Sequence, residues 1–396
     1  MRRPKTSGKG RPRVVTADVV VIGGGVMGSA CAWVLAEAGR SVVVLEKSIP
    51  GAEASSAAAG ILGAGAEAHG PGPLAELLGA GLPRHAAWAR RLGRQTGIDV
   101  EFREGGVLRV AETAASLRAL AKETAWMEGT GRKRRVLSAA EVRKLEPALA
   151  KSPGGVFFPE DARIDPKKFF RAVHVAAERA GARFESGAYV KEILTENDRA
   201  VGVAVESGTV YRGKTVVLAA GSWSTLVPGA KLPEDAVIPA RGQVVELELP
   251  RPVLSRVVAG PRCYLVPRDD GRILVGATVE FVGYRREVTA RGIRDLLDAA
   301  VTLVPALGDA TFGASWSSFR PYTADELPLL GRSAVPGLLL ATGHYRNGIL
   351  LAPITAEIIR AIVLGKSPPL PVDPYAAKRL ETAENRAPLR ARRNRD

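Results

Sequence analysis

Cysteine is nearly absent from this sequence. Cys31 and Cys263 are the only two among 396 residues, and the chain has only four histidines. Neither residue type recurs at a spacing that zinc sites use, and two cysteines cannot build a disulfide framework. We therefore expect no metal site and no structural disulfide. Cys31 falls inside a predicted helix, where we interpret it as a small core residue.

Long apolar runs are also missing. No stretch approaches the roughly 20 apolar residues of a membrane-spanning helix, and the segment after Arg3 lacks the hydrophobic core of a signal peptide. We expect a cytoplasmic protein without a membrane span. Aromatic residues make up only 5% of the chain, whereas it contains 43 glycines. This composition favours an α/β enzyme with many tight strand-to-helix turns.

Acidic residues are scarce at both ends of a chain whose formal net charge is +15. Residues 1–13 contain six basic residues and no acid, and residues 378–396 contain seven basic residues against three acids. These ends lack apolar periodicity, so we expect solvated, poorly ordered tails. The body keeps a charge of +5, which is ordinary for a domain that binds anionic small molecules. We expect no nucleic-acid partner.

A short β-branched run, Asp18-Val19-Val20-Val21-Ile22, is followed at once by Gly23-Gly24-Gly25-Val26-Met27-Gly28. A helical stretch from Ser29 to Gly39 comes next, and a second strand over Ser41–Leu45 ends at Glu46. Strand, glycine turn, helix, strand and acid within about thirty residues is the fingerprint of a dinucleotide-binding βαβ unit.

Each glycine of the fingerprint has a physical role. Gly23 makes the tight turn, Gly25 lets the backbone approach a pyrophosphate, and Gly28 allows close packing of helix on strand. The diphosphate then lies at the positive end of the helix. Glu46 is placed to accept hydrogen bonds from the adenosine ribose, and its charge disfavours NADP.

Two later segments are predicted to join the same sheet. Lys214–Trp223 and Gly337–Gly343 are apolar runs that end in small residues. The loop His344–Gly348 follows the second run, and Ile349–Leu364 is predicted to form a helix with Pro353 in its first turn. The positive end of that helix can stabilise negative charge on a reduced isoalloxazine, which favours FAD over NAD.

The material between these segments is predicted to form an antiparallel sheet that caps the flavin. Asp269-Asp270-Gly271 is a hairpin signal between two of its strands. The expected strands are Val244–Leu249, Arg262–Pro267, Arg272–Thr278 and Gly313–Ser318.

Three stretches resemble the D-amino-acid oxidase family of flavoproteins, and most closely its glycine oxidase branch. They are Ser55–Ala64, Cys263–Arg268 with Val275–Thr278, and Gly343–Pro353. The similarity extends more weakly from about Ala17 to about Leu364. The fold class is therefore α/β, with a Rossmann-type FAD-binding domain and an inserted antiparallel-sheet substrate domain. The expected organisation is a basic disordered tail over 1–16, the FAD-binding domain over 17–92, 160–228 and 318–368, the substrate domain over 93–159 and 229–317, and a basic C-terminal tail over 369–396.

The resemblance implies which residues hold FAD. Besides the fingerprint glycines, they are Val26, Met27, Glu46, Lys47, Ala54, Ser55, Ala59, Gly60, Ile61, Val190, His344, Tyr345, Arg346, Asn347, Gly348, Ile349 and Leu350. Related sarcosine oxidases attach flavin through a cysteine near the segment Phe319–Thr323. No cysteine stands there in this chain, so we expect noncovalent FAD.

The resemblance also implies that Arg320 fixes the substrate carboxylate, with Tyr264 and Arg346 lining the same pocket. A guanidinium offers two parallel donors that match a carboxylate in charge and shape. Arg346 has an alternative role in supporting FAD or the backbone, and Tyr264 has one in packing. His344 is either a base or a residue that positions its loop.

The activity implied is oxidation of glycine, sarcosine or D-alanine to the imine, which hydrolyses to an oxo acid and ammonium. Oxygen then reoxidises the flavin to give hydrogen peroxide, and the glycine imine is a precursor for the thiamine thiazole. A homotetramer is implied by the resemblance alone. One alternative is a dehydrogenase that passes electrons to a quinone. Another is a catalytically silent flavin-binding or nucleic-acid-associated protein whose basic tails bind.

Two segments depart from the glycine oxidase pattern. They are Val279–Tyr284, which is expected to approach the substrate side chain, and Arg241-Gly242-Gln243, which is more basic than the corresponding stretch of that branch. These departures affect the identity of the amine rather than the class of reaction.

Overall fold

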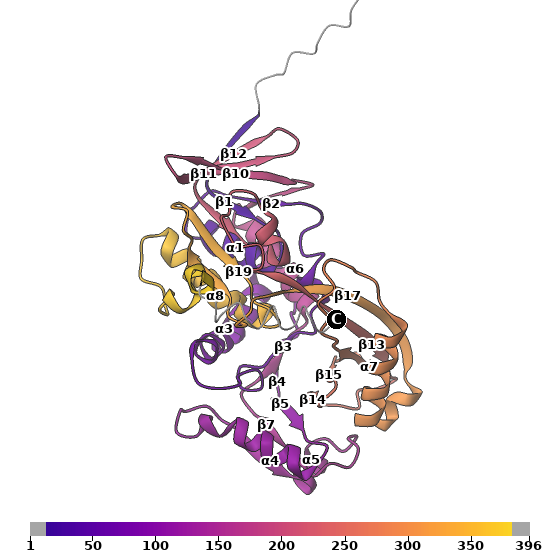
Figure 1. The fold of residues 1–396 in the computed structure, drawn as a ribbon. Helices are drawn as coiled ribbons and strands as arrows, with labels where there is room; N and C mark the ends of the chain where they lie inside the picture. Colours follow the sequence, from indigo (N-terminus) through magenta and orange to yellow (C-terminus); the bar gives the residue numbers. More distant parts are fainter. Residues whose placement is uncertain (1–12, 382–396) are drawn as a thin grey trace, which may run out of the picture.

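The computed structural model describes residues 13–381, and Figure 1 shows a parallel sheet at one end of the molecule and a second, largely antiparallel sheet at the other. Within the described residues the first sheet has eight strands, with a parallel centre in the order β9-β2-β1-β12-β19. Its strands are β1 (Val14–Ile22), β2 (Val42–Glu46), β9 (Arg183–Ser186), β10 (Val190–Glu196), β11 (Arg199–Val205), β12 (Val210–Leu218), β18 (Leu329–Arg332) and β19 (Leu338–Thr342).

The apolar run of β1 is buried on both faces of this sheet. Val19 and Val21 pack into the cluster that contains α1, whereas Val20 and Ile22 point to the opposite cluster, which β10 and β11 cover. Side chains alternate between faces along a strand, so a strand with two covered faces is apolar at every position. The four-residue run predicted from the sequence is explained in this way.

The second sheet also has eight strands within residues 13–381, in the order β17-β13-β16-β15-β14-β5-β7-β6. Asp269–Gly271 joins β15 to β16 as an antiparallel hairpin, which confirms the predicted turn. The strands are β5 (Val107–Val110), β6 (Arg135–Ser138), β7 (Gly154–Phe158), β13 (Ile238–Glu248), β14 (Val257–Ala259), β15 (Tyr264–Pro267), β16 (Arg272–Gly276) and β17 (Thr311–Tyr322).

Helices pack on both sheets. α1 (Val26–Ala36), α3 (Pro73–Thr96), α6 (Pro166–Arg179) and α8 (Gly348–Val363) contact one another beside the parallel sheet (Figure 1). The second sheet is covered by α4 (Ala114–Glu123), α5 (Ala139–Leu145) and α7 (Ala290–Leu303). The short elements are α2 (Ala54–Ala57), β3 (Ile61–Leu62), β4 (Arg103–Glu104), β8 (Ala162–Arg163), η1 (Ala125–Met127), η2 (Gly221–Leu226), η3 (Pro305–Asp309), η4 (Asp373–Tyr375) and η5 (Ala377–Glu381).

β13 and β17 are longer than the sequence predicts. They pair from Glu248 with Thr311 to Ile238 with Tyr322, so the ladder continues beyond the predicted ends. Arg320 therefore lies within this ladder, opposite Ala240 of β13, and close to the end of β17. The first sheet takes strands from residues 14–46, 183–218 and 329–342, and the second from residues 107–158 and 238–322. The division into FAD-binding and substrate domains stays a prediction.

Parts of both segments predicted to be disordered tails belong to the fold. Val14, Val15 and Thr16 extend β1 and pair with residues 210–212 of β12, because the main-chain ladder continues past the apolar run. Near the other end, Tyr375 is buried and its hydroxyl donates to the Pro73 carbonyl at 2.8 Å. Residues 1–12 and 382–396, which carry most of the excess basic charge, lie outside the described residues.

Two further findings concern the helices. Pro353 does not lie in the first turn of α8 as predicted, because the helix begins at Gly348, which makes Pro353 its sixth residue. Among the helices between residues 13 and 381, every one is too short or too polar to span a bilayer.

His85 joins α3 to the first turn of α8. It is fully buried, and its Nε2 lies 3.0 Å from the Leu350 carbonyl oxygen, so Nε2 carries the proton. Burial lowers the pKa of His85 to about 4. The folded protein therefore keeps this imidazole neutral at pH values where the unfolded chain protonates it.

A pH-dependent loss of stability follows from His85. The unfolded chain binds the proton near pH 6.5, so the stabilising contribution is present above that pH and is lost as the pH falls toward 4. His85→Gln keeps a donor for the Leu350 carbonyl but does not titrate. We expect the wild-type minus variant difference in free energy of unfolding to fall by roughly 2–3 kcal/mol between pH 7 and 4.5. Urea denaturation across this range measures it, and a pH-independent difference would contradict the assignment.

Candidate functional site

A cavity of about 720 Å³ lies between the two sheets. Its walls come from the turn after β1, from α2 and β3, from strands of the second sheet, and from the loop before α8. Pockets of this size accommodate large ligands, and their polar groups are few and fix the orientation of the ligand. The cavity is the candidate site for a dinucleotide together with a small second ligand.

The glycine turn brings α1 against the sheet without intervening side chains. Gly23 has φ +104°, and a Cβ there would lie 2.5 Å from the Ala219 carbonyl oxygen. A Cβ on Gly28 would lie 1.9 Å from the carbonyl oxygen of Gly23. Both positions therefore exclude a side chain, as the fingerprint predicts.

The N-terminus of α1 opens to the cavity. Gly25 is the N-cap residue and offers no side-chain acceptor, and the first turn contains no acid. The Val26 N–H donates to Ser55 Oγ at 2.9 Å, whereas helix geometry leaves the next N–H groups without an intrahelical acceptor. N–H donors at the positive end of a helix whose first turn carries no acid fit the diphosphate of FAD.

Glu46 lines the cavity beside this turn and is buried. Its Oε2 accepts the Gly24 N–H at 2.8 Å and its Oε1 accepts the Ser48 N–H at 2.9 Å. Each carboxylate oxygen keeps a further lone pair for a ribose hydroxyl. Next to it, Lys47 lies with its Nζ 3.4 Å from the centre of the Trp223 ring, and burial lowers the pKa of Lys47.

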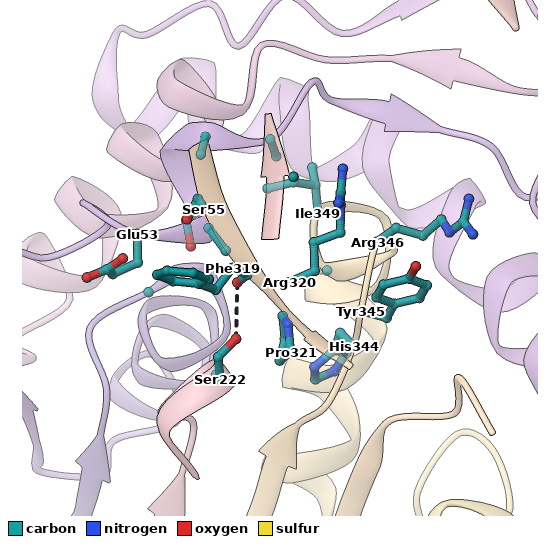
Figure 2. Close-up of a pocket in the computed structure, with 18 of the residues that line it drawn as sticks. Glu53, Ser55, Ser222, Phe319, Arg320, Pro321, His344, Tyr345, Arg346 and Ile349 are labelled. Carbon is teal, nitrogen blue, oxygen red and sulfur yellow. Dashed lines mark hydrogen bonds between the residues drawn. The ribbon is translucent and has the colours of Figure 1, made fainter. Parts of the chain in front are cut away.

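The other end of the cavity carries Arg320, Tyr264 and Arg346. Arg320 Nη1 donates to the Thr278 carbonyl at 3.0 Å. The guanidinium packs directly against Gly242, because a Cβ added to that glycine would lie only 2.2 Å from Arg320 Nη1. The Tyr264 ring covers Gly276 in the same way. Figure 2 shows Arg320 extending from β17 between Phe319 and the loop that carries Tyr345 and Arg346.

The two arginines at this end of the cavity differ in whether a carboxylate compensates their charge. Arg346 Nε lies 3.4 Å from Glu67 Oε2, so its charge is compensated. Arg320 forms no ion pair with a carboxylate within residues 13–381, and its hydrogen bonds are to neutral groups, the Thr278 carbonyl and the Tyr264 hydroxyl. Burial raises the pKa of Tyr264 despite the neighbouring guanidinium, so its phenol is neutral. Arg320 is thus a cation available to an anionic ligand at this end of the cavity.

His344 connects the loop before α8 to the helix itself. It is buried, its Nε2 lies 3.0 Å from Thr355 Oγ1, and burial lowers its pKa to about 3. The ring therefore ties the loop to α8 as a neutral group, which favours the positioning role over the catalytic one. In the same loop the Tyr345 N–H donates to the Pro321 carbonyl at 2.9 Å, which fixes the loop beside Arg320.

Most residues predicted for FAD and substrate line this one cavity, and Gly28 and Leu350 do not. Gly28 lies behind the turn against Gly23, and Leu350 is buried where α8 meets α3. Those that line the cavity are Gly23, Gly25, Val26, Met27, Glu46, Lys47, Ala54, Ser55, Ala59, Gly60, Ile61, Val190, Tyr264, Arg320, His344, Tyr345, Arg346, Asn347, Gly348 and Ile349.

Several lining residues were not predicted. Glu67, which pairs with Arg346, follows the Ser55–Ala64 motif by only three residues, but nothing in the sequence links it to a residue 279 positions later. Trp223 and Phe319 also line the cavity and contact each other edge to face. Phe319 directly precedes Arg320 along β17, and alternation along the strand would have placed the two side chains on opposite faces.

Both cysteines remain thiols. Cys31 is fully buried in α1, and burial raises its pKa to about 12. Cys263 lines the cavity, and burial raises its pKa to about 11. Across residues 13–381 no group of three His, Cys, Asp or Glu side chains is placed to hold a metal ion.

The combination of a glycine turn on a parallel sheet and a cavity closed by a second sheet defines a class of flavoenzyme. The pattern of the FAD dependent oxidoreductase family, DAO, matches residues 18–362, so the chain belongs to this family. FAD is its cofactor, and the family resemblance seen in the sequence is confirmed.

Among its relatives, the chain is 35% identical to the glycine oxidase of Geobacillus kaustophilus over 91% of this chain and 97% of the relative. The crystal structure of glycine oxidase from that organism superimposes with a TM-score of 0.88, covering 92% of this chain and 98% of the other, at 34% identity. Iminodiacetate oxidase from Chelativorans sp. BNC1 gives a TM-score of 0.82 at 27% identity, with 90% and 98% covered.

The chain is also 36% identical to the bifunctional protein ThiO/ThiG of Synechocystis over 93% of its own length. It spans only 55% of that relative, and 54% of the similarly named protein of Nostoc. The similarity is therefore to about half of each bifunctional protein.

Gly28→Ala should abolish FAD loading, because the added Cβ would lie 1.9 Å from the Gly23 carbonyl oxygen and must push α1 off the turn. Gly93→Ala is the matched control, since its Cβ would meet nothing closer than 3.9 Å. The ratio of flavin to protein absorbance after incubation with excess FAD measures the effect. Equal loading of both variants would contradict the close packing at the turn.

Proposed function

We propose that this protein oxidises glycine or a similarly small amino acid, such as sarcosine or D-alanine, with noncovalent FAD. One observation carries the proposal: Arg320 presents a guanidinium with no carboxylate partner, within residues 13–381, to the cavity that the glycine turn also borders. The similarity to glycine oxidases supports the choice of substrate.

In this proposal Arg320 anchors the substrate carboxylate. Two parallel N–H donors meet two carboxylate oxygens, and the match is stronger in a cavity that excludes water. Arg346 is already compensated by Glu67, so the net charge of the pocket suits a ligand with one carboxylate. Tyr264, with a neutral phenol beside Arg320, donates a further hydrogen bond to the same group.

The residues that would hold FAD are those that line the cavity from the glycine turn to the loop before α8. Ser55, Glu46 and Lys47 would hold its adenosine and diphosphate part, and the N-terminus of α8 would face its ring. When bound, FAD supplies the redox chemistry, taking two electrons from the amine carbon and passing them to oxygen as hydrogen peroxide.

The protein's own contribution is orientation. His344 is neutral and bonded to Thr355, so we propose no general base, and the amine reacts in its neutral form. Holding the carboxylate on Arg320 fixes where the amine carbon lies, which converts an encounter in solution into a positioned reaction. The imine product then hydrolyses in water to the oxo acid and ammonium.

Three finer points belong to the same proposal. The glycine imine would serve thiamine thiazole synthesis, which the similarity to the ThiO/ThiG proteins supports. A homotetramer in the cytoplasm is proposed from the family resemblance. The parts 17–92, 160–228 and 318–368 would form the FAD-binding domain, and 93–159 and 229–317 the substrate domain.

Arg320→Met should leave FAD bound and raise KM for glycine by about 100-fold, because a charge-assisted two-donor contact is lost. A peroxide assay with glycine, sarcosine and D-alanine, with flavin absorbance in parallel, measures both quantities. Arg294→Met is the control, since Arg294 is exposed, does not line the cavity, and forms its ion pair with the adjacent Asp295. No turnover of any of the three substrates by the wild type would reject the proposed activity. An unchanged KM in Arg320→Met would reject the carboxylate anchor.

A further inference from the structure

The two segments that depart from the glycine oxidase pattern meet each other in the structure. Arg241 in β13 and Glu280 after β16 exchange main-chain hydrogen bonds, Arg241 N to Glu280 O at 2.8 Å and Glu280 N to Arg241 O at 3.0 Å. Their side chains also form an ion pair, with Arg241 buried and Glu280 partly buried. The two departures are therefore one structural feature.

Glu280 is surrounded by donors. Its Oε2 accepts from Arg241 Nε at 3.1 Å and from Arg241 Nη2. Its Oε1 accepts from Gln243 Nε2 at 2.7 Å and from Thr278 Oγ1 at 2.5 Å. Burial raises the pKa of Glu280, but the hydrogen bonds from these three side chains outweigh it, and the pKa lies below its ordinary value. An ionised carboxylate is the only side chain of this size that accepts on both oxygens.

This network reaches the substrate end of the cavity through Thr278. The Thr278 hydroxyl donates to Glu280 and also accepts the Gln243 N–H at 2.9 Å, which fixes residue 278 from two sides. The carbonyl of the same residue accepts from Arg320 Nη1 at 3.0 Å. Gly242, between Arg241 and Gln243, is the residue over which the Arg320 guanidinium lies. The network thus supports both surfaces that hold Arg320.

The network also fixes the segment that follows Glu280, residues 285–289. Arg241 Nη1 donates to the carbonyl oxygens of Arg285 at 3.2 Å and Glu287 at 2.9 Å. Gln243 Oε1 accepts the Thr289 N–H at 2.8 Å. Because Arg241 and Glu280 neutralise each other, they add no net charge beside Arg320. Arg320 is therefore held in position without a second uncompensated charge beside it.

We propose that Glu280 is a positioning residue that, paired with Arg241, sets the orientation of the Arg320 guanidinium for a substrate carboxylate. The inference rests on the proposed function for the identity of the ligand, but the geometry concerns any small carboxylate. Glu280 lies behind Arg320 and is not proposed to touch the substrate. Its replacement should weaken carboxylate binding and leave FAD loading intact.

Glu280→Gln is the test variant. It keeps the size of the side chain but replaces one carboxylate oxygen by an NH2 group. That NH2 group then faces the donors of Arg241 or those of Gln243 and Thr278, and the hydrogen bonds on that side are lost. Glu146→Gln is the matched control, because Glu146 is a buried acid in the same part of the protein, bonded to Arg256 at 2.8 Å and to Ser255, and does not line the cavity. Both variants lose an ion pair with one buried and one partly buried partner, so both should be less stable than the wild type.

We expect Glu280→Gln to raise KM for glycine about tenfold with kcat within twofold. Calorimetric titration of the FAD-loaded protein with acetate should show a similar increase in Kd, and the flavin content should equal that of the wild type. Glu146→Gln should leave KM, Kd and flavin content unchanged. Equal KM and Kd in the two variants would overturn the inference.

Failure of the proposed activity gives a different pattern. If the wild type turns over no amino acid but binds acetate, and Glu280→Gln alone weakens that binding, the positioning role stands while the proposed function falls. If the wild type oxidises glycine and Glu280→Gln binds glycine and acetate as the wild type does, the function stands and the positioning role falls.

Discussion

The contact between the first turn of α1 and the ends of β1 and β12 is the constraint on which the rest of the structure depends. Gly23 and Gly28 leave no space for side chains between helix and sheet, and the positive end of the helix therefore faces the cavity. A diphosphate can approach main-chain N–H groups only where nothing projects in front of them. The turn would fix the position of the cofactor, and the second sheet forms the opposite wall of the same cavity.

The distribution of charge is the second theme. The chain is strongly basic, yet near the substrate end the cations are mostly paired, Arg346 with Glu67 and Arg241 with Glu280. Pairing has a function here, because several unpaired cations would attract anions at several places, whereas Arg320 beside paired arginines favours one position for a carboxylate. Selectivity therefore depends on which arginine lacks an acidic partner, and not on how many arginines the pocket contains.

How much could be predicted from the sequence depends on how far apart along the chain the interacting residues lie. The βαβ unit and the hairpin at Asp269–Gly271 were predictable, because local residues determine them. The pairing of Val14–Thr16 with residues 210–212, and that of Glu67 with Arg346, join segments nearly 200 residues apart or more, and no local pattern records them. The Arg241–Glu280 pair was visible only as two unexplained departures from the family pattern.

Oxidation of glycine by the bound flavin is tested most directly by one measurement, the visible absorbance of the flavin when glycine is added in the absence of oxygen. We expect this absorbance to be lost in the wild type, at a rate that saturates with glycine, and to return when air is admitted. Protein that takes up FAD but keeps its full visible absorbance with glycine, sarcosine and D-alanine alike would contradict it.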